Sequence, residues 1–228
     1  RQLKAERIHV VVGHGAEQVS AAIAAPDVTT YVQAEQLGTG HAALQAAPSC
    51  LPQSTVLVLY GDVPLLTTEV LSEVVNAASH SPVLLAATLD NPIGYGRVIR
   101  DSNGCFAKVV EQKDASPDEL AVAEVNTGVL AAQASELHSW LLQVTNDNVQ
   151  GEFYLPDVLG LALDDGREVS VVVTDRSSDI AGVNARAQLE ELERAYQTRQ
   201  AKALMADGVR VMDANRLDIR GSLSCGVD

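Results

Sequence analysis

Short apolar runs alternate with amphipathic stretches along much of the chain, and this alternation predicts strands and helices in turn. The strand-like runs are residues 8–12, 28–32, 55–60 and 82–89, rich in Val, Leu and Ile. Residues 41–47 and 67–78 instead space their apolar side chains as a helix does. Because the two kinds of element follow each other at short intervals, we expect βαβ crossovers and a mixed, mostly parallel sheet, and hence an α/β fold.

From residue 91 onward the rhythm changes. Residues 97–100 and 105–111 flank Asn103-Gly104, a pair favoured in tight hairpin turns, so the pattern predicts an inserted β-hairpin. Beyond the hairpin it predicts strands at 125–130 and 168–173 and helices at 137–144 and 154–163. Trp140 falls on the apolar face of its helix and is predicted in the core. These elements together form a predicted main domain over residues 1–184.

A long amphipathic helix follows the main domain. Residues 185–208 carry one apolar stripe and end in Asp207-Gly208, as expected of a connecting or linker helix. The stripe consists of Leu189, Leu192, Tyr196, Ala203 and Leu204. Residues 209–228 hold short β-like pieces, too few to bury a core, and are expected to begin another domain. Because the patterns at Arg1 and Asp228 are unfinished, we expect a longer parent chain.

Composition narrows the classes of function. A formal net charge of −14 argues against binding to nucleic acid, which requires a surplus of Lys and Arg. A small anionic ligand remains possible, because main-chain N–H groups and a metal ion can hold phosphates in an acidic protein. Three scattered cysteines predict a reducing, cytoplasmic setting, and the absence of a long apolar run predicts no contact with a membrane.

Candidate chemistry gathers where the predicted strands end. In open α/β sheets, ligands bind outside the carboxyl ends of the strands. Gly38-Thr39-Gly40 allows close approach of the main chain to a ligand, and Gln33 can read a base edge, although the same loop could be an ordinary turn. Asp62 could be either a ligand of a hard divalent cation or a turn cap. Glu111 and Asn126 could bind sugar hydroxyls or lie on the surface.

Other kinds of site receive little support. The five histidines lack the spacing of a zinc site, and no nucleophile elbow or Cys/His pair is present. We therefore predict no side-chain nucleophile.

Six motifs, taken in order, resemble the bacterial bifunctional N-acetylglucosamine-1-phosphate uridyltransferase/glucosamine-1-phosphate N-acetyltransferase family. They are Gln33-Ala34-Glu35-Gln36-Leu37-Gly38-Thr39-Gly40-His41-Ala42, Tyr60-Gly61-Asp62-Val63-Pro64-Leu65, Gly94-Tyr95-Gly96-Arg97, Val110-Glu111-Gln112-Lys113-Asp114-Ala115, Glu124-Val125-Asn126-Thr127-Gly128 and Gly182-Val183-Asn184. The resemblance runs from about His9 to the last residue. A single motif would be weak, but six in order are specific.

The resemblance implies Mg²⁺-dependent transfer of UMP from UTP to N-acetylglucosamine 1-phosphate, giving UDP-N-acetylglucosamine and pyrophosphate for cell-wall peptidoglycan and lipopolysaccharide. By position, Gln33 and Gly38 match the family's uracil contacts. The residues that match its nucleotide-sugar contacts are Thr39, Tyr60, Gly61, Gly96, Glu111 and Asn126. Asp62 and Asn184 match its pair of metal ligands, and both also count among the residues that bind the substrates. The implied step is in-line attack on the α-phosphorus without a covalent intermediate.

The implied fold is a Rossmann-like, glycosyltransferase-A-like nucleotidyltransferase domain. Residues 209–228, including Asn215-Arg216-Leu217, resemble the entry into a left-handed β-helix that would carry the acetyltransferase site and most contacts of a homotrimer. Family members also have a strand and a glycine-rich phosphate loop that this chain lacks, so we expect little or no activity from the chain alone. Since that strand should be central, we further expect unpaired strand edges and aggregation.

Two rival hypotheses remain. A single-activity nucleotidyltransferase could use another sugar 1-phosphate, such as glucose 1-phosphate, although the residues after Gly208 argue against it. A non-catalytic nucleotide-binding or assembly module would be favoured if the native protein truly lacked the phosphate loop.

Overall fold

In a computed structural model, residues 2–226 are described, and their packing divides them into two units. The first unit contains the residues up to Tyr60 together with Thr67–Asp175. The second contains Gly61–Leu66 together with the residues from Arg176 onward. The domain limits predicted at residues 184 and 208 divide the chain into consecutive stretches, and they stay a prediction. Packing instead groups the short segment around Asp62 with residues that lie far along the sequence.

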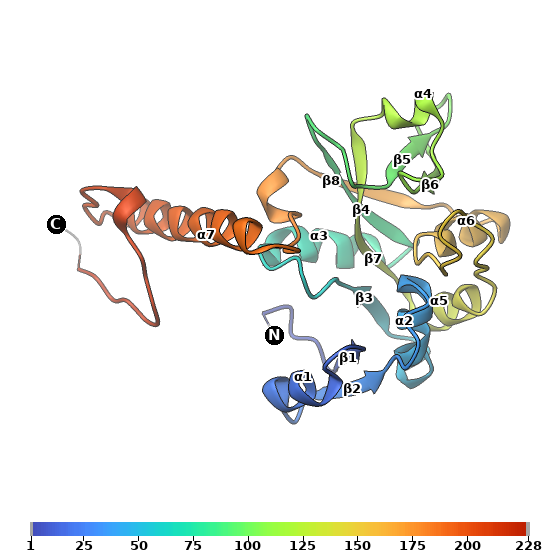
Figure 1. Cartoon of the computed structure of the whole chain (residues 1–228), viewed down its shortest axis with the longest axis horizontal. Coiled ribbons are helices and arrows are strands. Elements are labelled where there is room, and N and C mark those ends of the chain that lie inside the picture. Colours follow the sequence, from blue (N-terminus) through green and yellow to red (C-terminus); the bar gives the residue numbers. More distant parts are fainter. Residues whose placement is uncertain (1, 227–228) are drawn as a thin grey trace. The chain divides into compact units, whose positions relative to one another are not determined.

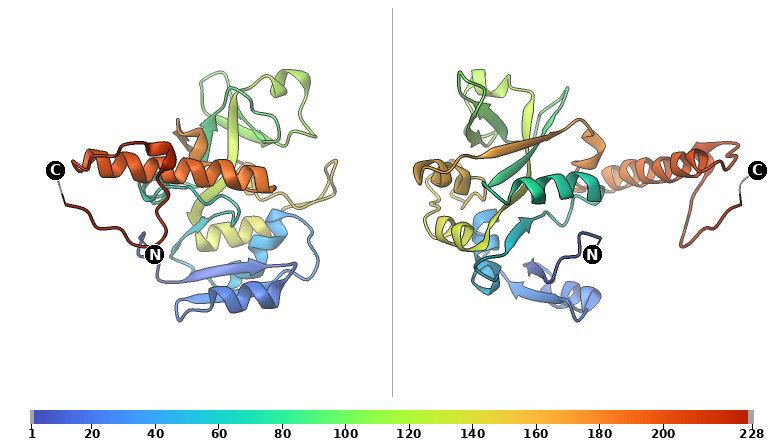
Figure 2. Two further views of the ribbon diagram at one scale, coloured as in Figure 1. Left: turned by 60° about the vertical axis from the view of Figure 1, so that its left-hand side comes forward. Right: turned by 180° about the vertical axis from the view of Figure 1, so that it is seen from behind.

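The first unit contains two sheets (Figure 1). In the smaller sheet, β1 (Ile8–Val12) pairs in parallel with β2 (Val28–Val32), and α1 (Ala16–Ile23) lies alongside them (Figure 2). The strands of the larger sheet are β3 (Thr55–Val58), β4 (Val83–Thr88), β5 (Arg97–Arg100), β6 (Phe106–Val110), β7 (Glu124–Gln133) and β8 (Ser170–Thr174). Their order is β6-β5-β7-β4-β8, and β3 also pairs with β7.

The α/β class and the mixed sheet are confirmed, as is the β5–β6 hairpin across Asn103-Gly104. The expectation of a mostly parallel arrangement is wrong for the larger sheet. Strands β4 and β8 are parallel, but β7 runs antiparallel to β3, β4 and β5. The reason is the inserted hairpin, because its two strands carry the chain out and back and β7 then enters the sheet in the reverse direction.

Helices cover both faces of the larger sheet. On one face lie α2 (Thr39–Ala46), α5 (Ala134–Leu141) and α6 (Asp157–Asp164), which share a buried core with Leu84 and Ala86 of β4. Val83 and Leu85 alternate with these residues, are also fully buried, and point to the opposite face. Helix α3 (Thr68–Ala77) contacts β4 and β8 and buries Val70, Leu71 and Val74.

Local signals explain several element ends. The side chain of Thr67 accepts a hydrogen bond from Val70 N and caps α3. Trp140 is 2% exposed, which confirms its core position, and its indole N–H donates to Asp165 Oδ2 at 2.7 Å. The short helix α4 (Pro117–Leu120) was not predicted, although Ser116 and Glu119 form a capping box at its start. Three-residue 3₁₀ turns occur at η1 (Ala47–Ser49), η2 (Ser177–Asp179) and η3 (Ala214–Arg216).

The second unit is built on α7 (Arg186–Ala206), the long helix that the sequence predicts. Its buried residues are Leu192, Gln197 and Ala201, whereas Leu189 and Tyr196 of the predicted stripe are 53% and 41% exposed. Gln197 is buried because the tail covers it: Ile219 N donates to Gln197 Oε1 at 2.8 Å, and Gln197 Nε2 donates to Ile219 O. The predicted stripe is therefore wrong at Leu189 and Tyr196, which are exposed, while Gln197 outside the stripe is buried.

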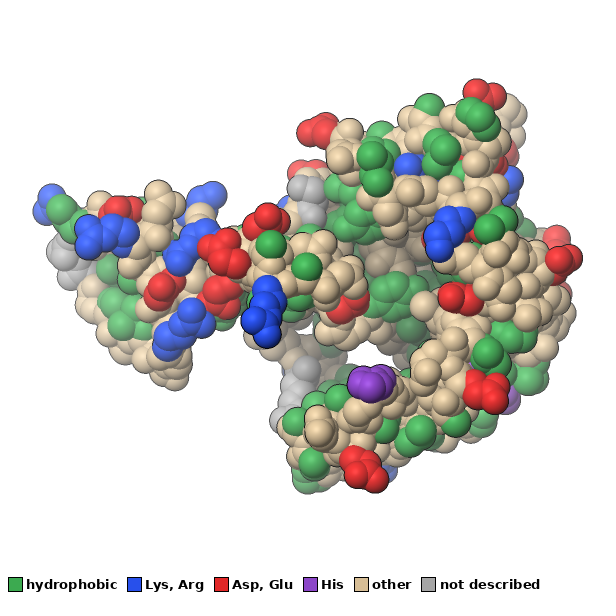
Figure 3. All heavy atoms as spheres, viewed as in Figure 1, with side chains coloured by type: hydrophobic (Ala, Val, Ile, Leu, Met, Phe, Trp, Pro, Cys, Tyr) green, Lys and Arg blue, Asp and Glu red, His purple; other side chains and the backbone are tan. Residues whose placement is uncertain are grey.

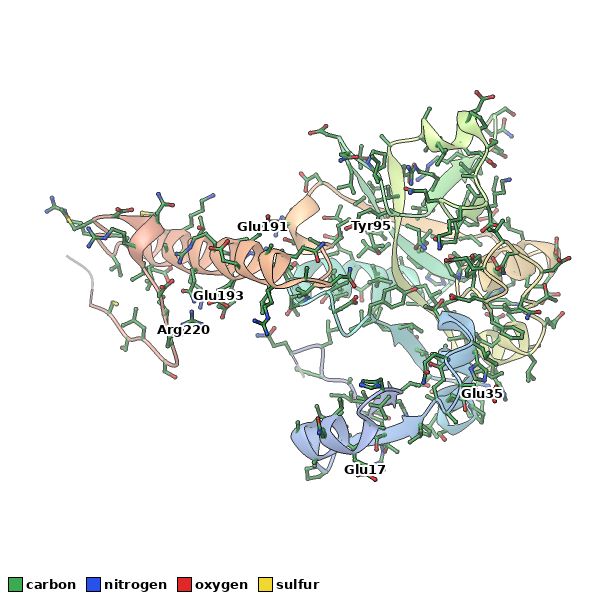
Figure 4. All side chains as sticks on the ribbon, viewed as in Figure 1. Glu17, Glu35, Tyr95, Glu191, Glu193 and Arg220 are labelled. Carbon is green, nitrogen blue, oxygen red and sulfur yellow. The ribbon has the colours of Figure 1, made fainter. Side chains whose placement is uncertain are left out.

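Charged side chains occupy much of the remaining surface of α7. Basic and acidic groups are interspersed along it in Figure 3, and Glu193 pairs with Arg220 of the tail at 2.9 Å (Figure 4). Between residues 209 and 226 the structure describes a 3₁₀ turn and no strand, so the start of a β-helix and the linker role of α7 stay predictions. Within residues 2–226, no helix combines the length and apolar character needed to cross a membrane.

Candidate functional site

Main-chain contacts hold the glycine loop that precedes α2. Phe153 N donates to Leu37 O, and Gly40 N donates to Phe153 O, each at 2.8 Å. Gly38 has a φ of 114°, and a Cβ there would lie 2.6 Å from Phe153 O, so the position requires glycine. Thr39 Oγ1 accepts a hydrogen bond from Leu155 N at 3.0 Å. The predicted residues Gly38 and Thr39 thus both contact the segment of Phe153 and Leu155, which lies more than a hundred residues later in the sequence.

Gln33 lies directly after β2 and is 8% exposed. Its amide nitrogen donates to Gly38 O at 3.1 Å and lies 2.9 Å from His41 Nδ1. The amide is therefore held in one orientation between the loop and α2, and its Oε1 remains to accept a hydrogen bond from a ligand. Glu35, labelled in Figure 4, is exposed on the same loop. Gln33, Gly38 and Thr39 form one cluster.

A second cluster forms around an irregularity in β7. The register of β4 against β7 shifts between Leu84 and Ala86, and Thr127 Oγ1 donates to Leu85 O at 2.7 Å. Gly128 follows with a φ of 79°, and a Cβ there would lie 2.2 Å from Cε2 of Tyr60. The ring of Tyr60 therefore lies directly against the main chain of Gly128.

Asn126, two residues before Gly128, connects this ring to the hairpin. Asn126 is 7% exposed, its N–H donates to Gly96 O, and its Oδ1 accepts from Gly128 N, both at 2.9 Å. Its side chain also hydrogen-bonds the carboxylate of Glu111. A Cβ at Gly96 would lie 2.9 Å from Glu111 Oε1, so those residues touch as well. Tyr60, Gly96, Glu111 and Asn126, predicted separately along the chain, are brought together.

The carboxylate of Glu111 lies in an acidic environment. Burial raises its pKa, the nearby charges of Asp157 and Asp114 raise it further, and the hydrogen bond from Asn126 opposes the change. Burial, assisted by Asp114, raises the pKa of Asp157 to about 6. These three carboxylates line a cavity of about 220 Å³ together with Tyr154, whose hydroxyl donates to Asp114. The group is suited to accept hydrogen bonds from sugar hydroxyls.

The predicted metal pair lies in the second unit. Asp62 O accepts a hydrogen bond from Val183 N at 2.9 Å, and the position of a Cβ at Gly182 is 3.7 Å from Asp62 Oδ2. Asn184 is the next residue after Val183, and its N–H donates to Gln188 Oε1 at the start of α7. Asp62 and Asn184 are both exposed. Gly61 belongs to the same segment as Asp62.

This pair has the chemistry that a hard divalent cation prefers. A carboxylate and an amide oxygen are oxygen ligands, and Mg²⁺ commonly takes one or two protein ligands while water and substrate phosphates complete its shell. The exposed side chains leave room for those other ligands. Among residues 2–226, no group of three or more His, Cys, Asp or Glu side chains is arranged to hold a metal. A cation here would therefore depend on its substrate for part of its coordination.

Four contributors were missed from the sequence. Phe153 supplies main-chain contacts, and such contacts leave no signal in a side-chain pattern. Gly128 was quoted in a motif but given no role, although an Asn-Thr-Gly run inside a strand is a bulge signal. Asp157 is the first residue of α6, where an acidic side chain is common in any helix and gives no sign of a site. Arg97 was likewise quoted in a motif without a role. It is 2% exposed, its side chain donates to Tyr95 O, and its Nε has no partner among the described residues.

Comparison with known proteins adds to this geometry. Residues 1–211 match the MobA-like NTP transferase domain. The chain is 52% identical over 229 residues to the bifunctional protein GlmU of Burkholderia multivorans (strain ATCC 17616 / 249), covering 100% of this chain and 51% of the relative. It is 51% identical, with the same coverage, to the bifunctional protein GlmU of Burkholderia pseudomallei (strain 668). The chain thus spans about half the length of the curated relatives it matches.

Proposed function

This chain belongs to the MobA-like NTP transferase domain family, and we propose that it carries the site at which UMP is transferred from UTP to N-acetylglucosamine 1-phosphate. The products are UDP-N-acetylglucosamine and pyrophosphate. Family membership supports a nucleotide and a sugar phosphate as substrates. The identity of the base and the sugar rests on the six ordered motifs and on the similarity to the bifunctional relatives.

One contact carries the proposal. The hydrogen bond from Val183 N to Asp62 O joins the segment that follows β3 to the segment that contains Asn184. These segments are separated by more than a hundred residues, and each supplies one oxygen ligand of a kind suited to Mg²⁺. An exposed carboxylate and amide, held in register by a main-chain bond, support a metal-assisted transfer of a phosphoryl-type group.

The remaining residues bind and orient the substrates. Gln33 and Gly38 receive the uracil. The residues assigned to the nucleotide-sugar are Thr39, Tyr60, Gly61, Gly96, Glu111 and Asn126. Thr39 accepts from Leu155 N and so keeps its hydroxyl proton to donate to a ligand oxygen. Glu111 and Asn126 offer an acceptor and an amide to the sugar hydroxyls.

The transfer itself is a displacement at the α-phosphorus. An oxygen of the sugar phosphate forms a bond to that phosphorus as the bond to the pyrophosphate oxygen breaks. In this step no side chain becomes covalently attached to the substrate. Mg²⁺ held by Asp62 and Asn184 would neutralise phosphate charge as it develops. The chain's own residues contribute alignment of the two substrates, which can account for a large part of a rate enhancement.

The complete protein is proposed to be bifunctional and homotrimeric. Residues 209–226 would begin a left-handed β-helix carrying an acetyltransferase site, and the assembly would act on soluble substrates without nucleic acid or membrane. None of the acetyltransferase residues is assigned to this chain.

The test measures pyrophosphate release from UTP and N-acetylglucosamine 1-phosphate as a function of Mg²⁺. It uses this chain and a form of the protein extended to the length of its relatives. We expect release from the extended protein, little from the chain alone, and loss of release in an Asp62→Asn variant of the extended protein. A preference for dTTP with glucose 1-phosphate would overturn the substrate assignment. No release with any pair would favour a binding module.

A further inference from the structure

Arg199 of α7 bridges two parts of the second unit. Its Nη2 pairs with Asp179 Oδ1 at 2.6 Å, and its Nη1 donates to Leu65 O at 3.1 Å. Asp179 belongs to η2, and Leu65 belongs to the segment of Asp62. A planar guanidinium with several donors can hold two acceptors at once, whereas a lysine ammonium lacks this fixed fork.

Asp179 makes the bridge sensitive to substitution. The residue is 0% exposed, and its Oδ2 has no hydrogen-bond partner among the described residues. A buried carboxylate is costly unless a cation compensates it, so the position of Asp179 depends on Arg199. Ile180, the next residue, is 1% exposed, so this turn carries a buried apolar side chain as well.

The Asp62 segment is thereby held at two points. Val183 N binds the carbonyl of Asp62 at 2.9 Å, and Arg199 binds the carbonyl of Leu65 three residues later. The side chain of Leu65 is 7% exposed and adds an apolar anchor. Only Val63 and Pro64 lie between these points, so the segment that begins at Asp62 is fixed at both ends.

We propose that Arg199 and Asp179 are positioning residues for the Asp62–Asn184 metal pair. This inference rests on the proposed function. The bridge keeps the Asp62 carbonyl in register with Val183, and therefore keeps the carboxylate close to Gly182, two residues before Asn184. Groups that orient a metal ligand through its neighbours commonly change metal affinity by about tenfold or more when they are removed.

The experiment measures Mn²⁺ binding by electron paramagnetic resonance, in the presence of UDP-N-acetylglucosamine. The variants Asp62→Asn, Arg199→Gln and Arg194→Gln are compared in the full chain. Arg194 is the matched control, because it also lies on α7 and pairs with an aspartate, the exposed Asp218, at 2.8 Å. We expect Arg199→Gln to weaken Mn²⁺ binding about tenfold, with binding recovered at higher Mn²⁺, and Arg194→Gln to leave it unchanged.

The outcomes separate the two ideas. If Asp62→Asn loses Mn²⁺ while Arg199→Gln binds as the wild type does, the positioning role is refuted and the proposed metal site stands. If the wild type binds no Mn²⁺, or Asp62→Asn binds it normally, the metal site itself is refuted and the positioning role with it. Should Arg199→Gln fail to fold, Arg199→Lys decides, because it keeps the charge beside Asp179 without the second arm. Normal Mn²⁺ affinity in that variant would also refute the positioning role.

Discussion

At the scale of single residues, the site depends on a glycine that allows an aromatic ring to approach the main chain. Gly128 lies at a φ of 79° under the ring of Tyr60. The approach requires both the left-handed backbone and the missing Cβ, since a methyl group would meet the ring at 2.2 Å. The contact places Tyr60 beside Asn126, whose Oδ1 accepts from Gly128 N.

We expect Gly128→Ala to displace Tyr60 and to reduce binding of UDP-N-acetylglucosamine. The matched control is Gly104→Ala in the hairpin turn, where φ is 80° but nothing lies within 4 Å of the added methyl group. Both variants lose backbone freedom, but only the first meets a steric clash. Urea denaturation should show Gly128→Ala to be about 1–3 kcal/mol less stable than the control. Equal stability of the two variants would mean that the ring moves without cost.

Asp157 gives the fold a pH dependence. Its pKa is raised from 3.8 to about 6, mainly by burial. The folded protein therefore holds this proton more tightly than the unfolded chain, so its contribution to stability is complete below pH 4 and is lost as the pH rises to about 6. We expect Asp157→Asn to be more stable than the wild type at pH 7.5, by up to about 1 kcal/mol after solvent screening, and the difference to vanish near pH 4.

Denaturation at the two pH values checks this prediction. Asp118→Asn is the comparison, because Asp118 also lies in the first turn of a helix, α4, but does not line the cavity that Asp157 shares with Glu111 and Asp114. That variant should not gain stability at pH 7.5, since a carboxylate is favourable at the start of a helix. A stability gain of the same size in both variants would show that net charge, and not the surroundings of Asp157 in this cavity, is responsible.

At the scale of elements, the glycine loop and α2 are joined to the segment that leads into α6. Three hydrogen bonds make this connection, from Phe153 N to Leu37 O, from Gly40 N to Phe153 O and from Leu155 N to Thr39 Oγ1. Leu155 is 1% exposed, so its N–H has little access to water. The hydroxyl of Thr39 therefore stabilises the fold in addition to its proposed role toward the ligand.

The pair Thr39→Val and Thr39→Ser tests this connection. Valine has nearly the shape of threonine but leaves Leu155 N without an acceptor, which should cost about 1–3 kcal/mol of unfolding free energy. Serine keeps the oxygen and should remain close to the wild type. Thermal and urea unfolding measure the difference. Wild-type stability in Thr39→Val would show that Leu155 N finds another partner.

At the scale of the whole molecule, strand edges are the main liability. Strands β1 and β3 each have one strand partner in the part of the chain that is described. Residues of β1, β2 and β3 line one cavity of about 1090 Å³ in the first unit. Unpaired edges invite strands of other molecules, and the net charge of −14 only partly opposes such association.

We expect concentration-dependent aggregation of this chain, measurable by light scattering. Thr55→Lys places a charge on β3 where it lines the cavity, and it should suppress the aggregation. Thr30→Lys adds the same charge on β2 at an exposed position that does not line the cavity, and it should have less effect. Equal suppression by both variants would indicate that total charge, and not the β3 edge, controls association.

Most elements and the candidate residues could be inferred from the sequence. Apolar periodicity and capping signals are local, so β1, α3, the β5–β6 hairpin and α7 could be predicted from neighbours along the chain. The ordered motifs likewise give Gln33, Asp62, Glu111 and Asn126 as candidate site residues. Local signals carry no information on what covers an element, which is why the α7 stripe was partly wrong.

Which distant segments meet could not be inferred from the sequence and follows from the folded structure. The reversed direction of β7, the docking of Gly38 on Phe153, the raised pKa of Asp157 and the bridge from Arg199 to Leu65 and Asp179 all depend on contacts between residues remote in sequence. Burial, the pKa of a side chain and strand direction are properties of the assembled neighbourhood. They arise from packing and desolvation, which a local pattern of residue types does not contain.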